Sequence, residues 1–230
     1  MGGKNVKSTI LQWGLGMVAP HLCSGCLKIG GPLCTNCKYD ITSEPFVGCM
    51  LCGIPSREGI CSKHNQNLLR TWIVSERSPV LKELINKYKF ENSKSYALSL
   101  ASLLDVALPL LPPNTVLVPV PTVRARVRQR GYDHIDLLAR HVSNLRNLPL
   151  QRLLTRRGVS VQHMLNRQQR TEAAKDAYVL AEGARVDTSK IYVLIDDVVT
   201  TGATISSAAK VLAKAGATVW AVALAYQPLD

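Results

Sequence analysis

A run of aliphatic residues that ends in two aspartates and a threonine-rich turn constrains the fold of this chain most. The segment reads V-L-I-D-D-V-V-T-T-G-A-T over residues 193–204. Residues 191–195 are apolar almost throughout, which is typical of a parallel strand buried on both faces. Residues 206–215 have the pattern of a helix, which Gly216 would end. The sequence therefore predicts a strand, a loop and a helix in succession.

The rest of the second half repeats this alternation of strands and helices. Short apolar runs at residues 116–120 and 219–225 predict two further strands, and residues 135–145 predict a helix between them. Residues 72–111 look helical, because leucines and other apolar residues recur there at helical spacing. Strands that alternate with helices form a parallel sheet with right-handed crossovers. We therefore expect an α/β domain over residues 71–230.

The acidic pair and the turn after it have the chemistry of a sugar-phosphate site. Asp196 and Asp197 lie at the end of the predicted strand, where their carboxylates can accept hydrogen bonds from two ribose hydroxyls or hold a Mg²⁺-bound sugar. The turn opens a helix, whose first N–H groups favour a phosphate, and glycine lets the backbone approach that phosphate. The predicted phosphate-binding residues are Thr200, Thr201, Gly202, Ala203 and Thr204. The alternative is an acidic turn, capped by threonines, that binds no ligand.

All seven cysteines lie within the first 61 residues, at spacings that suit metal binding. A C-x2-C turn points two sulfurs at one point, and two such turns complete the tetrahedron that Zn²⁺ prefers. The two predicted ligand sets are Cys23, Cys26, Cys34 and Cys37, and then Cys49, Cys52, Cys61 and His64. Four protein ligands leave no position for water, so we expect two structural zinc sites in a small double zinc-ribbon module over residues 1–70. If His64 is instead an exposed loop residue, the second site holds three cysteines and an unidentified ligand, or is empty.

The cysteines also bear on the compartment. Clustered cysteines usually hold metal in a reducing compartment, whereas a disulfide framework normally has an even count and a secretory signal. Residues 1–20 are too short and too interrupted to span a membrane, and we expect an amphipathic helix there, with a signal peptide as the alternative. The predicted location is cytoplasmic, without stable membrane insertion.

The chain carries a formal net charge of +12, which favours an anionic partner. Arginines fall at every second position over residues 124–130. Others follow at Arg152, Arg156, Arg157, Arg167 and Arg170. Such a cluster suits a pyrophosphate pocket, where Arg donates bidentate hydrogen bonds, or a track for single-stranded nucleic acid. Aromatic residues for base stacking are scarce nearby, with Tyr132 and Tyr178 as candidates. A solvated basic surface without a specific partner is the third alternative.

The segment at residues 193–204 resembles the phosphoribosyl pyrophosphate motif of the type I phosphoribosyltransferases. A wider resemblance, to the ComF family, covers nearly the whole chain: the cysteine module, K-Y-K-F from Lys87, V-P-V-P from Val118 and an R-x-R-G-Y run. The family commonly has R-G-F-N-Q where this chain has R-G-Y-D-H, so Asp133 adds a negative charge. The family's Q-x-x-L-x-x-x-x-R pattern is matched by Gln162, Leu165 and Arg170, but the usual Asn three residues later is Ala173.

The resemblance implies a type I phosphoribosyltransferase-like fold that binds phosphoribosyl pyrophosphate or ribose 5-phosphate together with Mg²⁺. It implies that Asp196 and Asp197 meet the ribose hydroxyls, and that they are the catalytic pair if the enzyme is active. The loop after the first strand would contact pyrophosphate through Pro121, Arg124 and Arg130. The ComF family is associated with DNA uptake in competent bacteria, which implies single-stranded DNA and competence proteins as partners.

Two functions remain open on these grounds. In one, the protein retains phosphoribosyl binding and acts in single-stranded DNA handling during DNA uptake. In the other, it is an active phosphoribosyltransferase in nucleotide or amine metabolism, with an unidentified acceptor. Residues 155–178 are polar and weakly periodic, which makes them a candidate for a flexible lid in either case.

Overall fold

The computed structural model describes residues 21–90, 94–157 and 177–227. The expected helix at residues 1–20 lies outside the described residues, and so do the family pattern at 162–173 and most of the expected lid. In the described parts of the chain, no helix has the length and apolar character needed to cross a membrane.

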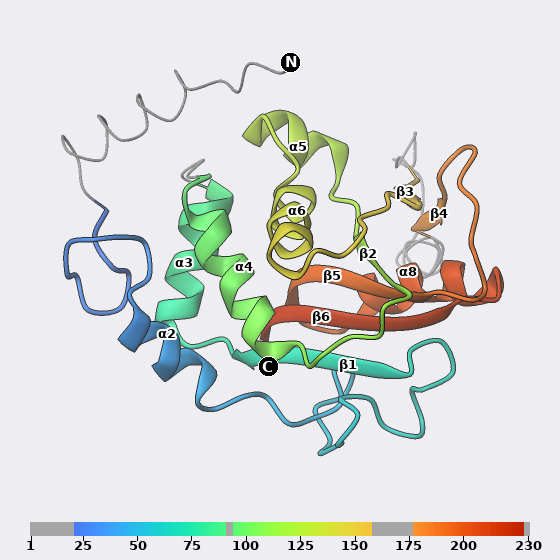
Figure 1. Ribbon diagram of the computed structural model, residues 1–230, viewed down its shortest axis with the longest axis horizontal. Coiled ribbons are helices and arrows are strands. Elements are labelled where there is room, and N and C mark those ends of the chain that lie inside the picture. Colours follow the sequence, from blue (N-terminus) through green and yellow to red (C-terminus); the bar gives the residue numbers. More distant parts are fainter. Residues whose placement is uncertain (1–20, 91–93, 158–176, 228–230) are drawn as a thin grey trace, which may run out of the picture.

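A parallel sheet forms the centre of the molecule, with strand order β1-β6-β5-β2 among the described residues (Figure 1). The strands are β1 (Arg70–Glu76), β2 (Thr115–Pro119), β5 (Ile191–Val199) and β6 (Thr218–Tyr226). The two inner strands, β5 and β6, are buried along nearly their whole length, as their aliphatic sequences require. Their carboxyl ends meet at one edge of the sheet, which is where open α/β sheets bind ligands.

Helices cover both faces of the sheet, and each face has its own apolar cluster. The helices are α2 (Thr35–Thr42), α3 (Pro79–Phe90), α4 (Tyr96–Ala107), α5 (Arg124–Arg130), α6 (His134–Arg146) and α8 (Ala203–Lys214). Val193 and Ile195 of β5 belong to the cluster with α3, α4 and α6, which stand together on one side in Figure 1. Tyr192 and Leu194 belong to the cluster with α8. Successive residues of β5 therefore face opposite layers, as the pleat of a strand dictates.

The second cysteine-rich segment packs directly on the sheet. Met50, Ile60 and Leu68 are buried in the same apolar cluster as α8. The backbone N–H of Thr71 in β1 donates to the carbonyl of Glu58 at 2.8 Å, which ties this segment to the edge strand. A separate antiparallel pair, β3 (Leu154–Arg156) with β4 (Tyr178–Leu180), lies beside α8.

The predicted fold class, an α/β domain with a parallel sheet and a small cysteine-rich module before it, is confirmed. The helical prediction for residues 72–111 is wrong at its start, because residues up to Glu76 belong to β1. Trp72 and Ile73 are aromatic or β-branched and pair with β6, a strand almost at the other end of the chain. The helix expected at residues 206–215 begins earlier, at Ala203.

Candidate functional site

The turn between β5 and α8 presents its polar groups to solvent at the carboxyl edge of the sheet. Gly202 is the N-cap of α8, with φ of 67°, a left-handed conformation that glycine adopts without strain. Gly202 is buried, whereas the predicted phosphate-binding residues on both sides of it, Thr200, Thr201, Ala203 and Thr204, are exposed. The first N–H groups of a helix lack intrahelical partners and carry partial positive charge. The turn therefore has the donors that a phosphate needs.

Asp197 is held by two basic side chains on the face of α3 and α6. Its Oδ2 accepts from Lys89 Nζ at 2.6 Å and from His134 Nε2 at 2.7 Å. Burial alone would raise the pKa of Asp197, but the charge of Lys89 and the hydrogen bond from His134 hold it well below its usual range. Asp197 is thus a carboxylate, with its charge balanced inside the protein.

Asp196 directly precedes Asp197 in the strand, and successive side chains of a strand point to opposite faces, so Asp196 faces the opposite layer. Burial raises the pKa of Asp196 to about 7, and the neighbouring charge of Asp197 adds to the rise. The N–H of Asp197, 2.9 Å from Asp196 Oδ1, and the charges of Lys89 and Arg156 oppose it. Two adjacent carboxylates therefore have different protonation behaviour, which is typical of functional sites.

Arg130 belongs to the Asp197 network, and His134 connects the two residues. Arg130 Nη1 lies 2.9 Å from His134 Nδ1, and both side chains are buried. Because a guanidinium only donates, Nδ1 must accept, and Nε2 then carries the hydrogen that meets Asp197. Tyr88 fixes the start of α6 by donating to the carbonyl of His134 at 2.6 Å. Of the three residues predicted for pyrophosphate, Arg130 is thus committed to an internal contact.

The other two, Pro121 and Arg124, line one cavity of about 490 Å³ beside β2. Arg128 and Arg156 line it as well, and Asp133 is the acidic residue among them. The alternating arginines lie in the helix α5, so they spread around it and do not share one side. This cavity is basic and lies at the loop that follows β2, the place expected for a pyrophosphate loop; β1 precedes β2, so β2 is not the first strand of the domain as the sequence suggested.

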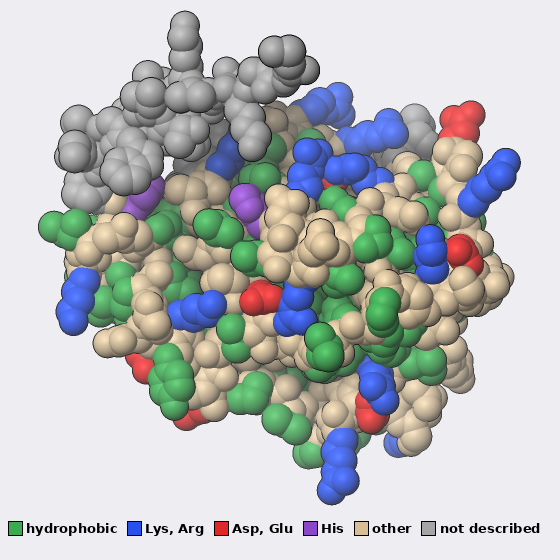
Figure 2. All heavy atoms as spheres, in the orientation of Figure 1, with side chains coloured by type: hydrophobic (Ala, Val, Ile, Leu, Met, Phe, Trp, Pro, Cys, Tyr) green, Lys and Arg blue, Asp and Glu red, His purple; other side chains and the backbone are tan. Residues whose placement is uncertain are grey.

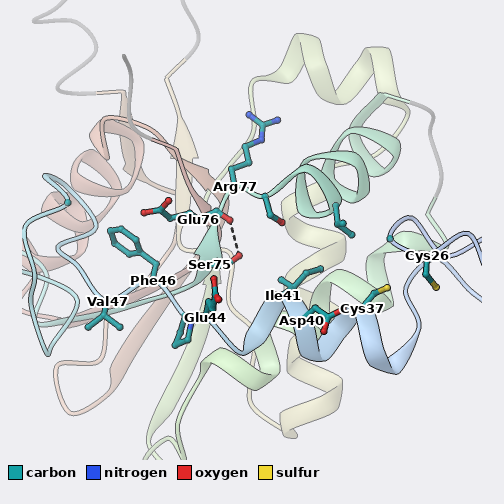
Figure 3. Close-up of a pocket in the computed structure, with 15 residues that line it drawn as sticks. Cys26, Cys37, Asp40, Ile41, Glu44, Phe46, Val47, Ser75, Glu76 and Arg77 are labelled. Carbon is teal, nitrogen blue, oxygen red and sulfur yellow. Dashed lines mark hydrogen bonds between the residues drawn. The ribbon is translucent and has the colours of Figure 1, made fainter.

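A larger cavity, of about 870 Å³, lies between the first cysteine segment and the end of β1 (Figure 3). In Figure 3, Asp40 and Cys37 from α2 stand on one side of it, and Phe46 and Glu76 stand on the other. Its lining includes the carboxylates of Asp40, Glu44 and Glu76. Carboxylates repel phosphate, so size alone does not identify the sugar-phosphate site.

The structure assembles both predicted metal-binding sets. Cys23, Cys26, Cys34 and Cys37 form one cluster, and Cys49, Cys52, Cys61 and His64 form the other; within each, the ligand atoms lie within 4.8 Å of one another. His64 Nδ1 is 3.3 Å from Cys61 Sγ and 3.5 Å from Cys49 Sγ, so this histidine joins the second cluster. Donor sets of this kind suit structural zinc, which takes four tetrahedral sulfur and nitrogen ligands.

The thiols deepest in each cluster are prepared for a cation. Burial would raise the pKa of Cys23, but the N–H groups of Cys26 and Cys34 lower it to about 6. The pKa of Cys49 is lowered to about 6 in the same way, against its burial, by the N–H groups of Cys61 and Leu51. A thiolate is the form of cysteine that binds metal.

Several named relatives match most of the length of this chain. Competence protein F of Haemophilus influenzae is 30% identical over 221 residues, which cover 88% of this chain and 95% of that protein. The chain belongs to the ComF family. The DNA utilization protein YhgH of Escherichia coli is 28% identical and covers 87% of this chain. Competence protein ComFC of Bacillus subtilis is 26% identical and covers 83% of it.

Family models and solved structures give no further indication of what the chain does. No family model matches the chain. A solved structure of adenine phosphoribosyl transferase from Trypanosoma brucei, in complex with AMP, pyrophosphate and ribose-5-phosphate, is 14% identical. It covers 68% of this chain and 83% of its own, with a TM-score of 0.41. A likeness this distant supports no argument about function.

Two departures from the usual ComF sequence now have a structural reason. Asp133 is the N-cap of α6: its Oδ1 accepts from the N–H of Ile135 at 3.0 Å and from the hydroxyl of Thr122 at 3.0 Å. Asn and Asp are equally good N-caps, so the added charge has a local partner in the helix end. His134, where the family commonly has Gln, donates to Asp197.

Sequence reasoning missed Lys89 and His134 as parts of this site. Both stand in motifs that the sequence singled out, K-Y-K-F and R-G-Y-D-H, but neither motif indicates which residue it contacts. The partner, Asp197, lies more than sixty positions further along the chain, as the separations show. Only the packing of α3 and α6 on β5 brings the three together.

Proposed function

We propose that this ComF family protein binds the phosphoribosyl group of phosphoribosyl pyrophosphate, or ribose 5-phosphate, and acts in single-stranded DNA handling during DNA uptake. The observation that carries the proposal is the exposed turn at residues 200–204, which opens α8 next to Asp196 at the carboxyl edge of the sheet. Mg²⁺ fits this site as a companion of the ligand, since it is usually bound by one or two carboxylates and by substrate phosphates.

The two aspartates would have unequal roles toward the ribose. Asp197 already has Lys89 and His134 as partners, and it would have to leave them to bind a hydroxyl directly. Asp196 lies on the face of α8, and its Oδ1 accepts from the backbone N–H of Asp197 at 2.9 Å. We therefore place Asp196 at the hydroxyls and give Asp197 the task of fixing the end of the strand.

The DNA part of the proposal rests on the basic surface. Arg124, Arg126 and Arg128 are exposed on α5, and Arg157 is exposed next to β3. Figure 2 shows Lys and Arg side chains gathered where Figure 1 places these two elements. Together with the net charge of +12, this surface favours phosphate backbones, and the relatives are named for competence and DNA utilization.

An active phosphoribosyltransferase is the second candidate. The cavity lined by Pro121, Arg124 and Arg128 would stabilise a leaving pyrophosphate, whose charge develops in the transition state. The acceptor is the missing half of that reaction. In either case we propose a cytoplasmic protein, because both metal clusters need reduced thiols. Competence proteins are the proposed partners, because two of the relatives are named for competence.

Calorimetric titration tests the ligand. Phosphoribosyl pyrophosphate and ribose 5-phosphate are titrated into the full chain with and without Mg²⁺, and the double variant Asp196→Asn/Asp197→Asn is compared with the intact chain. Asp187→Asn is the matched control, because Asp187 is an exposed aspartate that precedes the start of β5, whereas Asp196 and Asp197 lie near its carboxyl end. We expect binding by the intact chain and the control, and none by the double variant. Absence of binding at millimolar ligand contradicts the proposal.

Competition separates the two functions. Labelled single-stranded DNA is added to the protein with and without saturating phosphoribosyl pyrophosphate, and the triple variant Arg124→Gln/Arg126→Gln/Arg128→Gln is measured beside it. DNA handling predicts binding that weakens steeply with salt and is reduced in the triple variant. If the ligand binds and DNA does not, the transferase candidate is favoured.

A further inference from the structure

The second cysteine turn, at residues 49–52, contacts the phosphate turn, at residues 200–204. Leu51, between Cys49 and Cys52, lies against Gly202, so that a Cβ built on Gly202 would overlap Leu51 Cδ2 and come 3.4 Å from Leu51 Cα. Any side chain at position 202 would collide with Leu51. The space that glycine leaves is therefore used by the cysteine segment.

Leu51 contacts the turn at its buried residue. Gly202 is buried, whereas Thr200, Thr201 and Ala203 around it are exposed. Leu51 is only partly buried, and it packs against the apolar cluster that contains Ile205 of α8. Leu51 thus packs on the buried part of the turn, while the polar residues on both sides of Gly202 stay exposed.

The turn needs support of this kind. Its N-cap residue is glycine, the residue with the greatest backbone freedom, and no side chain caps the helix there. A donor arrangement that is not fixed in advance loses affinity, because the ligand must order it. Within the turn, Thr201 Oγ1 accepts from the N–H of Ala203 at a long 3.4 Å, and packing from outside the turn adds further order.

Leu51 itself is firmly placed. Cys49 and Met50, the two residues before it, are completely buried. The N–H of Cys49 donates to the carbonyl of Ile54, and the N–H of Met50 donates to the carbonyl of Gly59, both at 2.7 Å. Phe46 stacks on Tyr226 at the end of β6, with ring centroids 4.3 Å apart. The cysteine turn is thus anchored on both sides of Leu51, and a metal at Cys49 and Cys52 would complete its shape.

We propose that Leu51 is a positioning residue for the phosphate turn, and that the second metal site is thereby coupled to ligand binding. This inference rests on the proposed function, since it assigns a support to the same turn. Coupling between two sites is reciprocal. A metal that strengthens phosphoribosyl binding is therefore itself held more tightly when the ligand is bound.

The experiment uses the full zinc-loaded chain and the variants Leu51→Ala and Leu51→Met, with Leu69→Ala as the matched control because Leu69 is half exposed elsewhere. Zinc content, affinity for ribose 5-phosphate, and hydrogen exchange of residues 200–204 without ligand are measured for each. We expect Leu51→Ala to keep both zinc ions, to bind about 10-fold more weakly, and to exchange faster in the turn. Leu51→Met, which fills most of the volume, should restore both properties.

The outcomes are distinguishable from those of the proposed function. If the intact chain binds no ribose 5-phosphate, the proposed function fails, but hydrogen exchange still decides the role of Leu51. If Leu51→Ala loses zinc or unfolds, Leu51→Met is compared with Leu51→Gln, which has a similar length and a polar end. Unchanged exchange and affinity in zinc-loaded Leu51→Ala, or in Leu51→Gln where Leu51→Ala does not hold zinc, overturn the inference, as does a chelator that removes the second zinc equally fast with and without ligand.

Discussion

Asp196 and Asp197 are adjacent and both buried, yet they respond differently to the loss of charge. Asp197→Asn leaves Lys89 without the carboxylate 2.6 Å away, and breaking a buried ion pair costs about 3 kcal/mol. Asp196→Asn replaces a carboxyl whose pKa is already raised, to about 7, with a neutral group of the same shape. We expect Asp197→Asn to lower the free energy of unfolding by that amount at pH 6 and Asp196→Asn to leave it unchanged or higher, as measured by urea denaturation. Equal losses in the two variants would contradict this assignment.

From the raised pKa of Asp196 we also expect the stability of the protein to depend on pH. Burial raises the pKa of Asp196 to about 7 from its ordinary value of 3.8, so the folded chain binds a proton more tightly than the unfolded chain does. Its favourable contribution is complete below the unfolded pKa and is lost as pH rises towards 7. Asp196→Asn lacks this loss, so its melting temperature relative to the intact chain should be higher at pH 8 than at pH 5. An equal difference in melting temperature between the variant and the intact chain at both pH values would show that Asp196 is already ionised at pH 5.

The lowered pKa of Asp197 acts in the opposite direction. Its contribution is present above the unfolded pKa of 3.8 and is lost only as pH falls below that value. The pH 5 and pH 8 comparison therefore isolates Asp196. Asp197 affects stability in strong acid.

At the scale of elements, the turn before α8 joins a backbone requirement to a packing requirement. Gly202→Ala must place a Cβ at φ of 67° and against Leu51, whereas Gly183→Ala meets nothing within 4 Å at a φ of 72°. The control measures the conformational cost alone, about 1 kcal/mol, and the collision should add about 2 kcal/mol at Gly202. Urea denaturation of both variants measures the difference. Equal costs would mean that Leu51 moves aside freely.

The sequence predicts the inner part of this architecture well and its edges poorly. β2, β5 and β6 each contain a continuous apolar run, and their strand character follows from burial on both faces. The sequence places most of β1 in a helical region because β1 borders the helical pattern of α3, and its strand character depends on pairing with β6. A local pattern cannot show a partner that is about 150 residues away.

The candidate site divides in the same way. The cysteine clusters were predictable, since the spacing of ligands within each one is a local property. The phosphate turn was predictable from its position after a buried strand. The contact of Lys89 with Asp197 and that of Leu51 with Gly202 each join distant segments, and they follow only from the packing of the elements.

At the scale of the whole molecule, the two metal clusters have different structural tasks. The first cluster reaches the main apolar core through Ile41 of α2, whereas the second adds Met50, Ile60 and Leu68 to the core around α8. The division into residues 1–70 and 71–230 remains a prediction. The second cluster bears on it directly, because its segment packs into the core of the domain that follows. Loss of metal there should disturb the sheet and α8 together.

Cys26→Ser and Cys52→Ser form a matched pair, because each is the exposed second cysteine of a C-x2-C turn. Each variant should retain one zinc ion, since the other ligand set is intact. Cys52→Ser should lower the melting temperature by on the order of 10 °C, because the second cluster shapes part of the core beside α8. Cys26→Ser should lower it much less, because its cluster contributes less to that core. Calorimetry with metal analysis measures both, and an equal or larger loss in Cys26→Ser would mean that the first cluster supports the fold at least as much as the second.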